Sequence, residues 1–220
     1  MGPTRVKICG ITRPEDAQKA SEAGGDAIGI IFHRPARRFV EAAQARIIAQ
    51  AAGPFVTVVG VFVDASLRQI VRTARQVGLG TVQLNGDEPP ELVARLAEQG
   101  LRAIKALRVD QDLPRQIERW RQADPLPSGL VLETGGTSLP GGSGVANDWQ
   151  AIRRHQQAGL FDGMPPLILA GGLRPENVAR VVRELRPWAV DVSSGVEETT
   201  GVKSARLIAE FIQQARSAGA

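Results

Sequence analysis

Short apolar runs alternate with longer amphipathic stretches from one end of the chain to the other. Several of the short runs are apolar on both faces, such as residues 28–32 and 56–61, which is typical of parallel strands covered on both sides. The pattern predicts strands at residues 5–8, 27–32, 55–62, 81–84, 103–107, 129–132, 167–170 and 189–192.

The amphipathic stretches between these runs have helical periodicity. Several of them open with Pro, Glu or Asp, and Gly24, Gly78 and Gly100 each stand just past the end of one, as is usual at helix termini. Helices are therefore predicted at residues 14–23, 41–52, 67–77, 90–99, 113–123, 149–158, 175–185 and 203–218.

Eight strand–helix pairs within 220 residues predict an α/β fold, a single (β/α)8 TIM barrel with a parallel eight-stranded barrel and outer helices. We expect residues 1–220 to form one domain, because no linker or low-complexity tract interrupts the pattern. A doubly wound open sheet is the alternative. That fold usually carries a nucleotide-binding fingerprint after its first strand, and residues 9–12, Cys-Gly-Ile-Thr, are not one.

Composition narrows the classes of function. The chain has one cysteine, so it forms no internal disulfide, and we expect a cytoplasmic protein. No apolar run approaches a membrane span, and the N-terminus lacks the apolar core of a signal peptide. The net charge of +4 favours a site for anions. Scattered arginines and 4% aromatic residues without Tyr disfavour nucleic acid as a partner.

Functional residues of such barrels stand at the carboxyl ends of the strands. Cys9 follows the first predicted strand and Glu133 the sixth, so they would face each other as general base and general acid. Lys7 stands about 6–7 Å from Cys9 along the strand, so we expect no direct contact, and the sequence does not indicate what activates the thiol. A small buried apolar thiol and a surface carboxylate remain the alternative interpretations.

Two turns rich in small residues follow the seventh and eighth predicted strands. In this fold, the loops at these two places commonly bind phosphate through backbone N–H groups. Taken singly, each turn would be an ordinary tight turn, but together they predict a phosphate site at Gly171, Gly172, Ser193, Ser194 and Gly195.

Other polar residues complete the predicted mouth of the barrel. Arg38 follows the second strand and is suited to hold a substrate carboxylate bidentately, whereas Arg34 and Arg37 are expected to be solvated. The Gly-rich residues 135–144 are expected to form a mobile active-site loop. No metal site is predicted, because His33 and His155 are isolated in the sequence.

Seven motifs follow one another in order along nearly the whole chain. They are Lys7-Ile8-Cys9-Gly10-Ile11-Thr12 with Glu15-Asp16-Ala17, Arg37-Arg38-Phe39-Val40, Val59-Gly60-Val61-Phe62-Val63, Val82-Gln83-Leu84, Gly141-Gly142-Ser143-Gly144 with Asp148-Trp149, Ala170-Gly171-Gly172-Leu173-Arg174-Pro175-Glu176-Asn177-Val178, and Val190-Asp191-Val192-Ser193-Ser194-Gly195-Val196-Glu197. Together they resemble phosphoribosylanthranilate isomerase, an enzyme family of tryptophan biosynthesis.

The resemblance implies a TIM barrel without cofactor that performs an Amadori rearrangement of a phosphoribosylated anthranilate. It assigns Cys9 as the base at the ribose C2, Glu133 as the acid at the ring oxygen and Arg38 to the anthranilate carboxylate. It places Asp191 near the ribose, matches the two turns to phosphate loops, and implies a further loop at Gly141, Gly142, Ser143 and Gly144. The expected partner is a small phosphorylated substrate, with no membrane or nucleic acid, and the chain is expected to be a monomer or homodimer.

Three positions depart from the family pattern. Glu133 stands where the family has Asp, Asn85 where it usually has His, and Val145-Ala146-Asn147 replaces the usual residues before Asp148. The longer side chain at position 133 moves the carboxyl group by one methylene, a displacement that can cost about 10²-fold in rate. Two alternatives remain open: a related sugar-phosphate isomerase with another aglycone, and an impaired barrel that only binds phosphorylated ligands.

Overall fold

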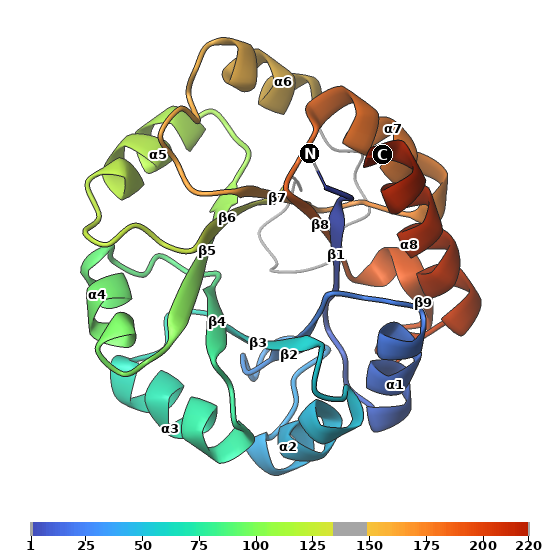
Figure 1. The fold of residues 1–220 in the computed structure, drawn as a ribbon. Coiled ribbons are helices and arrows are strands. Elements are labelled where there is room, and N and C mark those ends of the chain that lie inside the picture. The colour runs from blue at the N-terminus through green and yellow to red at the C-terminus, as the bar shows by residue number, and fades with distance from the viewer. Residues whose placement is uncertain (1, 134–148, 220) are drawn as a thin grey trace.

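The computed structural model describes residues 2–133 and 149–219. Figure 1 shows a closed barrel of parallel strands in chain order, surrounded by a ring of helices, which confirms the predicted TIM barrel. The barrel strands are β1 Arg5–Ile8, β2 Ala27–Ile31, β3 Thr57–Phe62, β4 Thr81–Leu84, β5 Arg102–Arg108, β6 Gly129–Glu133, β7 Leu167–Ala170 and β8 Ala189–Val192.

The helices between the strands follow the amphipathic stretches of the sequence. In the described part of the chain every predicted strand and helix is present, with ends that differ by no more than two residues. The helices are α1 Pro14–Glu22, α2 Ala42–Ala51, α3 Leu67–Val77, α4 Glu91–Ala97, α5 Leu113–Arg121, α6 Trp149–Gln157, α7 Pro175–Leu185 and α8 Ala205–Gly219. No helix within residues 2–133 and 149–219 has the length and apolarity needed to cross a membrane.

One prediction about the last helix was wrong, because Lys203 does not belong to it. After β8 the chain forms a 3-10 turn, Ser194–Val196, and an antiparallel hairpin of β9 Glu197–Thr199 and β10 Val202–Lys203. The backbone N–H of Lys203 donates to the Asp16 carboxylate at 3.0 Å, and its ammonium is fully buried. These long-range polar contacts override the local helical pattern, and they hold the hairpin beside α1, outside the barrel (Figure 1).

Strand register decides which side chains reach the inside of the barrel. Lys7 pairs with Asp191, Asp191 with Ala170, and Ala170 with Glu133, so these four residues form one row around the barrel. Paired residues of parallel strands point to the same face, and here that face is the interior. Beneath this row lies a small apolar layer of Ala106, Val131, Ile168 and Ala189, while the main core packs between strands and helices. The row therefore forms the floor of any cavity at the carboxyl-terminal end of the barrel.

Candidate active site

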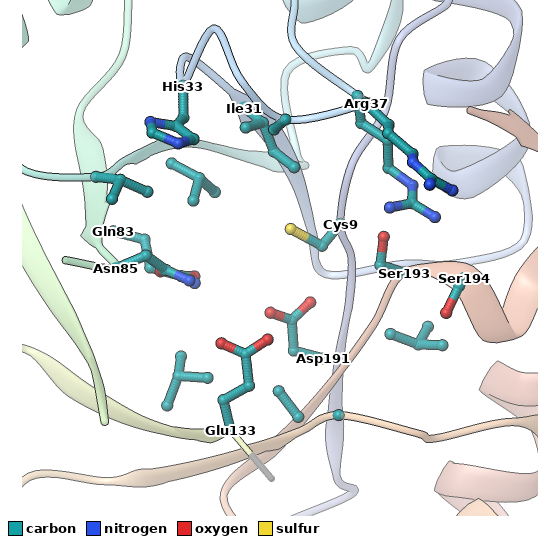
Figure 2. Close-up of a pocket in the computed structure, with 18 of the residues that line it drawn as sticks. Cys9, Ile31, His33, Arg37, Gln83, Asn85, Glu133, Asp191, Ser193 and Ser194 are labelled. Carbon is teal, nitrogen blue, oxygen red and sulfur yellow. The ribbon is translucent and has the colours of Figure 1, made fainter. Parts of the chain in front are cut away.

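A cavity of about 320 Å³ opens at the carboxyl-terminal end of the barrel, a size suited to a small ligand. The structure brings together, in its lining, all the predicted site residues that it describes: Cys9, Arg38, Glu133, Gly171, Gly172, Asp191, Ser193, Ser194 and Gly195. The predicted loop of Gly141, Gly142, Ser143 and Gly144 lies outside the described residues. Figure 2 shows the thiol and the carboxyl groups of Cys9, Asp191 and Glu133 pointing toward one another.

The ends of Lys7 and Cys9 come together over Gly29 and interact electrostatically, so the expectation that the two side chains stay apart was wrong. The flexible lysine chain runs along the barrel interior over Gly29, and both groups pack where that residue lacks a side chain. A Cβ at Gly29 would lie 2.6 Å from the Cys9 sulfur and 3.2 Å from the Lys7 nitrogen. Lys7 Nζ also donates a hydrogen bond to Asp191 Oδ2 at 2.6 Å, with both side chains 6% exposed. A glycine on the neighbouring strand thus lets a cation reach the thiol.

The charges around Cys9 act on its pKa in opposite directions. Burial raises the pKa of the thiol, the ammonium of Lys7 lowers it in part, and the Asp191 carboxylate raises it. For Lys7, burial alone would lower the pKa, but Asp191 and Cys9 outweigh it and raise that pKa above its ordinary value. Burial and Asp191 thus favour the neutral thiol, and the ammonium of Lys7 is placed to favour the thiolate.

Glu133 ends β6 and keeps its proton more readily than an exposed glutamate does. Burial raises its pKa, and the neighbouring charge of Asp191 raises it further, while Lys7 and Arg108 lower it in part. A carboxyl group with a raised pKa is suited to donate a proton near neutral pH. The site thus pairs a carboxyl group of raised pKa with a thiol in one cavity.

Two buried oxygen atoms in the cavity have no hydrogen-bond partner among the described residues: Asp191 Oδ1 and Gln83 Oε1. Gln83 Nε2 donates to Asn85 Oδ1 at 2.7 Å, which leaves the amide oxygen of Gln83 free. Leaving such an acceptor unsatisfied costs about 1–3 kcal/mol. Both oxygens suit the hydroxyl groups of a sugar. Sequence reasoning did not predict Gln83 as a site residue, although its alternation with Asn85, the residue after β4, could have placed both side chains on the inner face.

The two turns after β7 and β8 present backbone to the cavity. Gly171 and Gly172 have φ angles of 89° and 60°, in the left-handed region that favours glycine. At Gly195 a Cβ would lie only 1.9 Å from the carbonyl oxygen of Leu173, so the two turns pack directly against each other. Asn177 fixes the first turn, because its Nδ2 donates to the Gly172 carbonyl at 2.9 Å. Five small residues of these turns, Gly171, Gly172, Ser193, Ser194 and Gly195, line the cavity.

Arg38 is buried, and it already holds a carboxylate of the protein itself. Its Nε and Nη2 donate to Glu197 Oε1 and Oε2 at 2.7 and 2.6 Å. Lys203 donates to the same carboxylate at 2.9 Å. Arg34 and Arg37 are exposed, as expected, and Arg37 reaches the cavity rim (Figure 2). No local pattern in the sequence predicts the contacts made by Glu197 and Lys203.

The two histidines differ in their positions. His33 lines the cavity, which its isolation in the sequence did not indicate, whereas His155 lies in α6 on the outside of the barrel. Within the described part of the chain, no group of His, Cys, Asp and Glu residues could hold a metal ion.

Comparison with known proteins adds independent evidence. Residues 6–214 match the family model described as N-(5'phosphoribosyl)anthranilate (PRA) isomerase. The chain is 40% identical to N-(5'-phosphoribosyl)anthranilate isomerase of Ralstonia nicotianae, over 99% of this chain and 94% of the relative. The isomerase structure from Thermotoga maritima is similar, with a TM-score of 0.85 and 38% identity over 97% of this chain and 99% of that one.

A second solved structure carries information about a ligand. It is described as phosphoribosyl anthranilate isomerase in complex with reduced 1-(o-carboxyphenylamino)-1-deoxyribulose 5-phosphate. It is similar to this chain with a TM-score of 0.82 and 37% identity over 97% of this chain and 99% of that one. The fold, the family model and the relatives thus agree over almost the whole length.

Proposed function

The chain belongs to the N-(5'-phosphoribosyl)anthranilate isomerase family, and from that premise we propose that Cys9 and Glu133 carry the acid–base chemistry of its reaction. The enzyme converts N-(5'-phosphoribosyl)anthranilate to 1-(2-carboxyphenylamino)-1-deoxyribulose 5-phosphate, an aldose–ketose isomerisation of tryptophan biosynthesis. The observation that carries the assignment is the convergence of the thiol, the raised-pKa carboxyl group and the phosphate-type turns on one cavity.

The reaction requires one proton to be given and another to be taken. Glu133 donates its proton to the furanose ring oxygen, so the ring C–O bond breaks and a Schiff base forms at C1. The Cys9 thiolate then removes the proton from C2, and the electrons of that bond move into the Schiff base to give an enol-amine. Tautomerisation of the enol-amine gives the ketose product. The raised pKa of Glu133 supplies the acid form for the first step.

Lys7 favours the thiolate form of Cys9 that the second step requires. Burial and Asp191 disfavour a negative charge on Cys9, whereas Lys7 and, to a smaller extent, Lys203 favour it. Because Asp191 holds the ammonium at 2.6 Å, the cation stays beside the sulfur. We propose Lys7 as the residue that activates the thiol.

The remaining groups fit the parts of the substrate. The backbone of Gly171, Gly172 and Gly195 with Ser193 and Ser194 would bind the phosphate. Asp191 Oδ1 would accept a hydrogen bond from a ribose hydroxyl, since it is buried with no partner in the described structure. Arg38 would bind the anthranilate carboxylate through the donors that Glu197 leaves free.

The test follows the fluorescence decay of freshly made phosphoribosylanthranilate after purified protein is added. We expect Cys9→Ser and Glu133→Gln to lower kcat by about 10²- to 10⁴-fold, the usual contribution of a general acid or base. Glu176→Gln, a change at an exposed carboxylate on α7, is the control and should leave the rate unchanged. If neither site variant loses activity, the assigned chemistry is wrong. An inactive wild-type chain would leave only a barrel that binds phosphorylated ligands.

The proposal also covers the partners, the cellular location and the oligomeric state of the protein. We propose a small phosphorylated substrate as the partner, a cytoplasmic location, and a monomer or homodimer that does not bind nucleic acid. One similar structure is described as monomers derived from a dimeric isomerase of Thermotoga maritima. Light scattering on the purified chain decides between the two oligomeric states.

A further inference from the structure

We propose that Glu197 and Lys203, which we call the hairpin pair, position Arg38 and so determine the preference of the site for a substrate bearing a carboxylate. The two residues lie in β9 and β10, outside the barrel, and neither lines the cavity. The inference rests on the proposed role of Arg38, and it assigns a function to two residues that touch no substrate.

Glu197 fixes the orientation of the Arg38 guanidinium. The two hydrogen bonds of 2.7 and 2.6 Å engage Nε and Nη2, a planar bidentate contact between side chains 10% and 6% exposed. A guanidinium has five N–H donors, so three remain, and Nη1 has no partner among the described residues. One free donor on Nη2 and one on Nη1 lie together on the adjacent edge of the group, where a second carboxylate can bind in the same planar way.

The backbone at Gly10 leaves room for this arrangement. A Cβ at Gly10 would lie 2.5 Å from Arg38 Cδ and 2.9 Å from the Ser193 hydroxyl, and its φ is 71°. Arg38 therefore crosses directly above the residue that follows Cys9. The aliphatic part of the arginine packs on Gly10 while Glu197 holds its tip, so the side chain is fixed at both ends.

Lys203 supplies the charge that the Arg38–Glu197 pair lacks. One arginine and one glutamate sum to zero, so on their own they would offer an incoming anion no net attraction. Burial lowers the pKa of Lys203, and the Glu197 carboxylate 2.9 Å away offsets this in part. With its ammonium charged, Lys203 gives the group of three a net charge of +1. Burial disfavours the Glu197 carboxylate, but Arg38 and Lys203 outweigh it and lower the pKa of Glu197, so it stays ionised at neutral pH.

Lys203 also joins the arginine to the predicted phosphate rim. Its Nζ donates to the carbonyl oxygen of Ser193 at 3.0 Å, and its backbone N–H donates to the Asp16 carboxylate at 3.0 Å. One side chain thus anchors both the turn after β8 and the carboxylate that orients Arg38. The distance between the two proposed anion-binding groups is set by this lysine.

The experiment compares two substrates in steady-state kinetics: phosphoribosylanthranilate and the phosphoribosyl derivative of aniline, which lacks the carboxylate. For Glu197→Gln we expect KM for the first substrate to rise about 10- to 100-fold with little change in kcat. The aniline substrate should change by less than about threefold. Glu198→Gln, at the exposed neighbouring residue, is the matched control and should change neither.

A merely structural role for the hairpin pair gives a different result. In that case Glu197→Gln would lower kcat/KM equally for both substrates, which would overturn the proposal. The variant retains an acceptor of the same shape, and its inhibition constant for inorganic phosphate, expected to be unchanged, confirms an intact phosphate site. In an Arg38→Ala background Glu197→Gln should have no further effect on KM, and an additive effect would also overturn the proposal.

The same measurements separate this inference from the assigned function. If wild-type protein does not convert phosphoribosylanthranilate, the function itself is wrong. If Arg38→Ala raises KM for the carboxylate substrate and Glu197→Gln does not, the role of Arg38 stands and that of the hairpin pair falls. If Arg38→Ala raises KM equally for both substrates, Arg38 does not bind the substrate carboxylate. The proposed role of the hairpin pair is then wrong as well.

Discussion

Two buried lysine–carboxylate pairs lie in the barrel wall, and they serve different purposes. Lys7 and Asp191 are 2.6 Å apart, and Lys105 and Glu88 are 2.7 Å apart, with all four side chains nearly inaccessible to solvent. Lys105 faces away from the barrel interior, toward Trp120 of α5, with its ammonium 5.6 Å from the ring centre. Lys7 faces the interior, beside Cys9.

The two pairs differ in how completely their polar atoms are satisfied. Lys105 donates to the carbonyl oxygens of Leu84 and Gly86 as well as to Glu88. Glu88 accepts in turn from backbone N–H groups of Asp64 and Gly86, so both of its oxygens are used. By contrast, Asp191 keeps one oxygen without a partner among the described residues. A saturated pair holds loops in place, whereas an unsaturated pair in a cavity has bonding capacity left for a ligand.

The largest effect is expected at Lys105, where a substitution should lower stability and leave activity nearly unchanged. Lys105→Met leaves the Glu88 carboxylate buried without its cation, so we expect the free energy of unfolding to fall by about 3–5 kcal/mol. The kcat/KM of the protein that remains folded should stay within about threefold of wild type. Urea unfolding and kinetics at 25 °C measure the two quantities. A loss of activity without a loss of stability would remove the distinction between the two pairs.

At Lys7 the expected effect is on catalysis. Lys7→Met removes the cation that favours the Cys9 thiolate, so kcat/KM should fall about 10²-fold, a typical contribution of a positioned charge. Because Asp191 also loses its partner, stability falls as well, and circular dichroism must show folded protein at the assay temperature. Activity equal to that of wild type would show that another group activates the thiol.

The pH dependence of alkylation reports on the same contact. Cys9 is the one cysteine of the chain, so iodoacetamide labels a single site. Since burial raises the thiol pKa, we expect the labelling rate to increase with pH up to a midpoint above that of an ordinary cysteine. Lys7 lowers this pKa, so its removal should shift the midpoint to still higher pH. A shift to lower pH in Lys7→Met would contradict the arrangement.

The smallest effect is expected at Glu133. Glu133→Asp introduces the side chain of the family pattern and keeps a carboxyl group in the cavity, one methylene closer to the backbone. We expect kcat to change by less than about tenfold, compared with a loss of at least about 10²-fold in Glu133→Gln. Single-turnover rates measure both variants. Equal losses would show that the exact reach of the longer carboxyl group matters as much as its proton.

Sequence reasoning predicted the barrel because its signals are local. An apolar run such as β7 Leu167–Ala170 and an amphipathic stretch such as α3 Leu67–Val77 can each be recognised within about ten residues. The rule that function sits at strand ends then located Cys9, Glu133 and the two turns, and the structure brings them to one cavity.

The contacts that tune the site could not be found in this way. Arg38 and Glu197 are 159 residues apart in sequence, and Lys7 and Asp191 are 184 apart. Each pair is created by closure of the barrel, which brings β1 beside β8, and no local pattern marks its members. The role of Gly29 could not be predicted from the sequence either. It lacks a side chain where Lys7 and Cys9 of the neighbouring strand come together, and that proximity is seen only in the structure.

The row formed by Lys7, Asp191, Ala170 and Glu133 makes enzymatic turnover a sensitive reporter of correct folding. If β1, β6 or β8 closed one residue out of register, its inward side chains would turn to the helical side, and the row would lose a charged member. A barrel misregistered in this way would keep its helices and compactness but lose most of its turnover. During refolding, recovery of activity should therefore track the final closure of β8 on β1 and lag behind the recovery of helical signal.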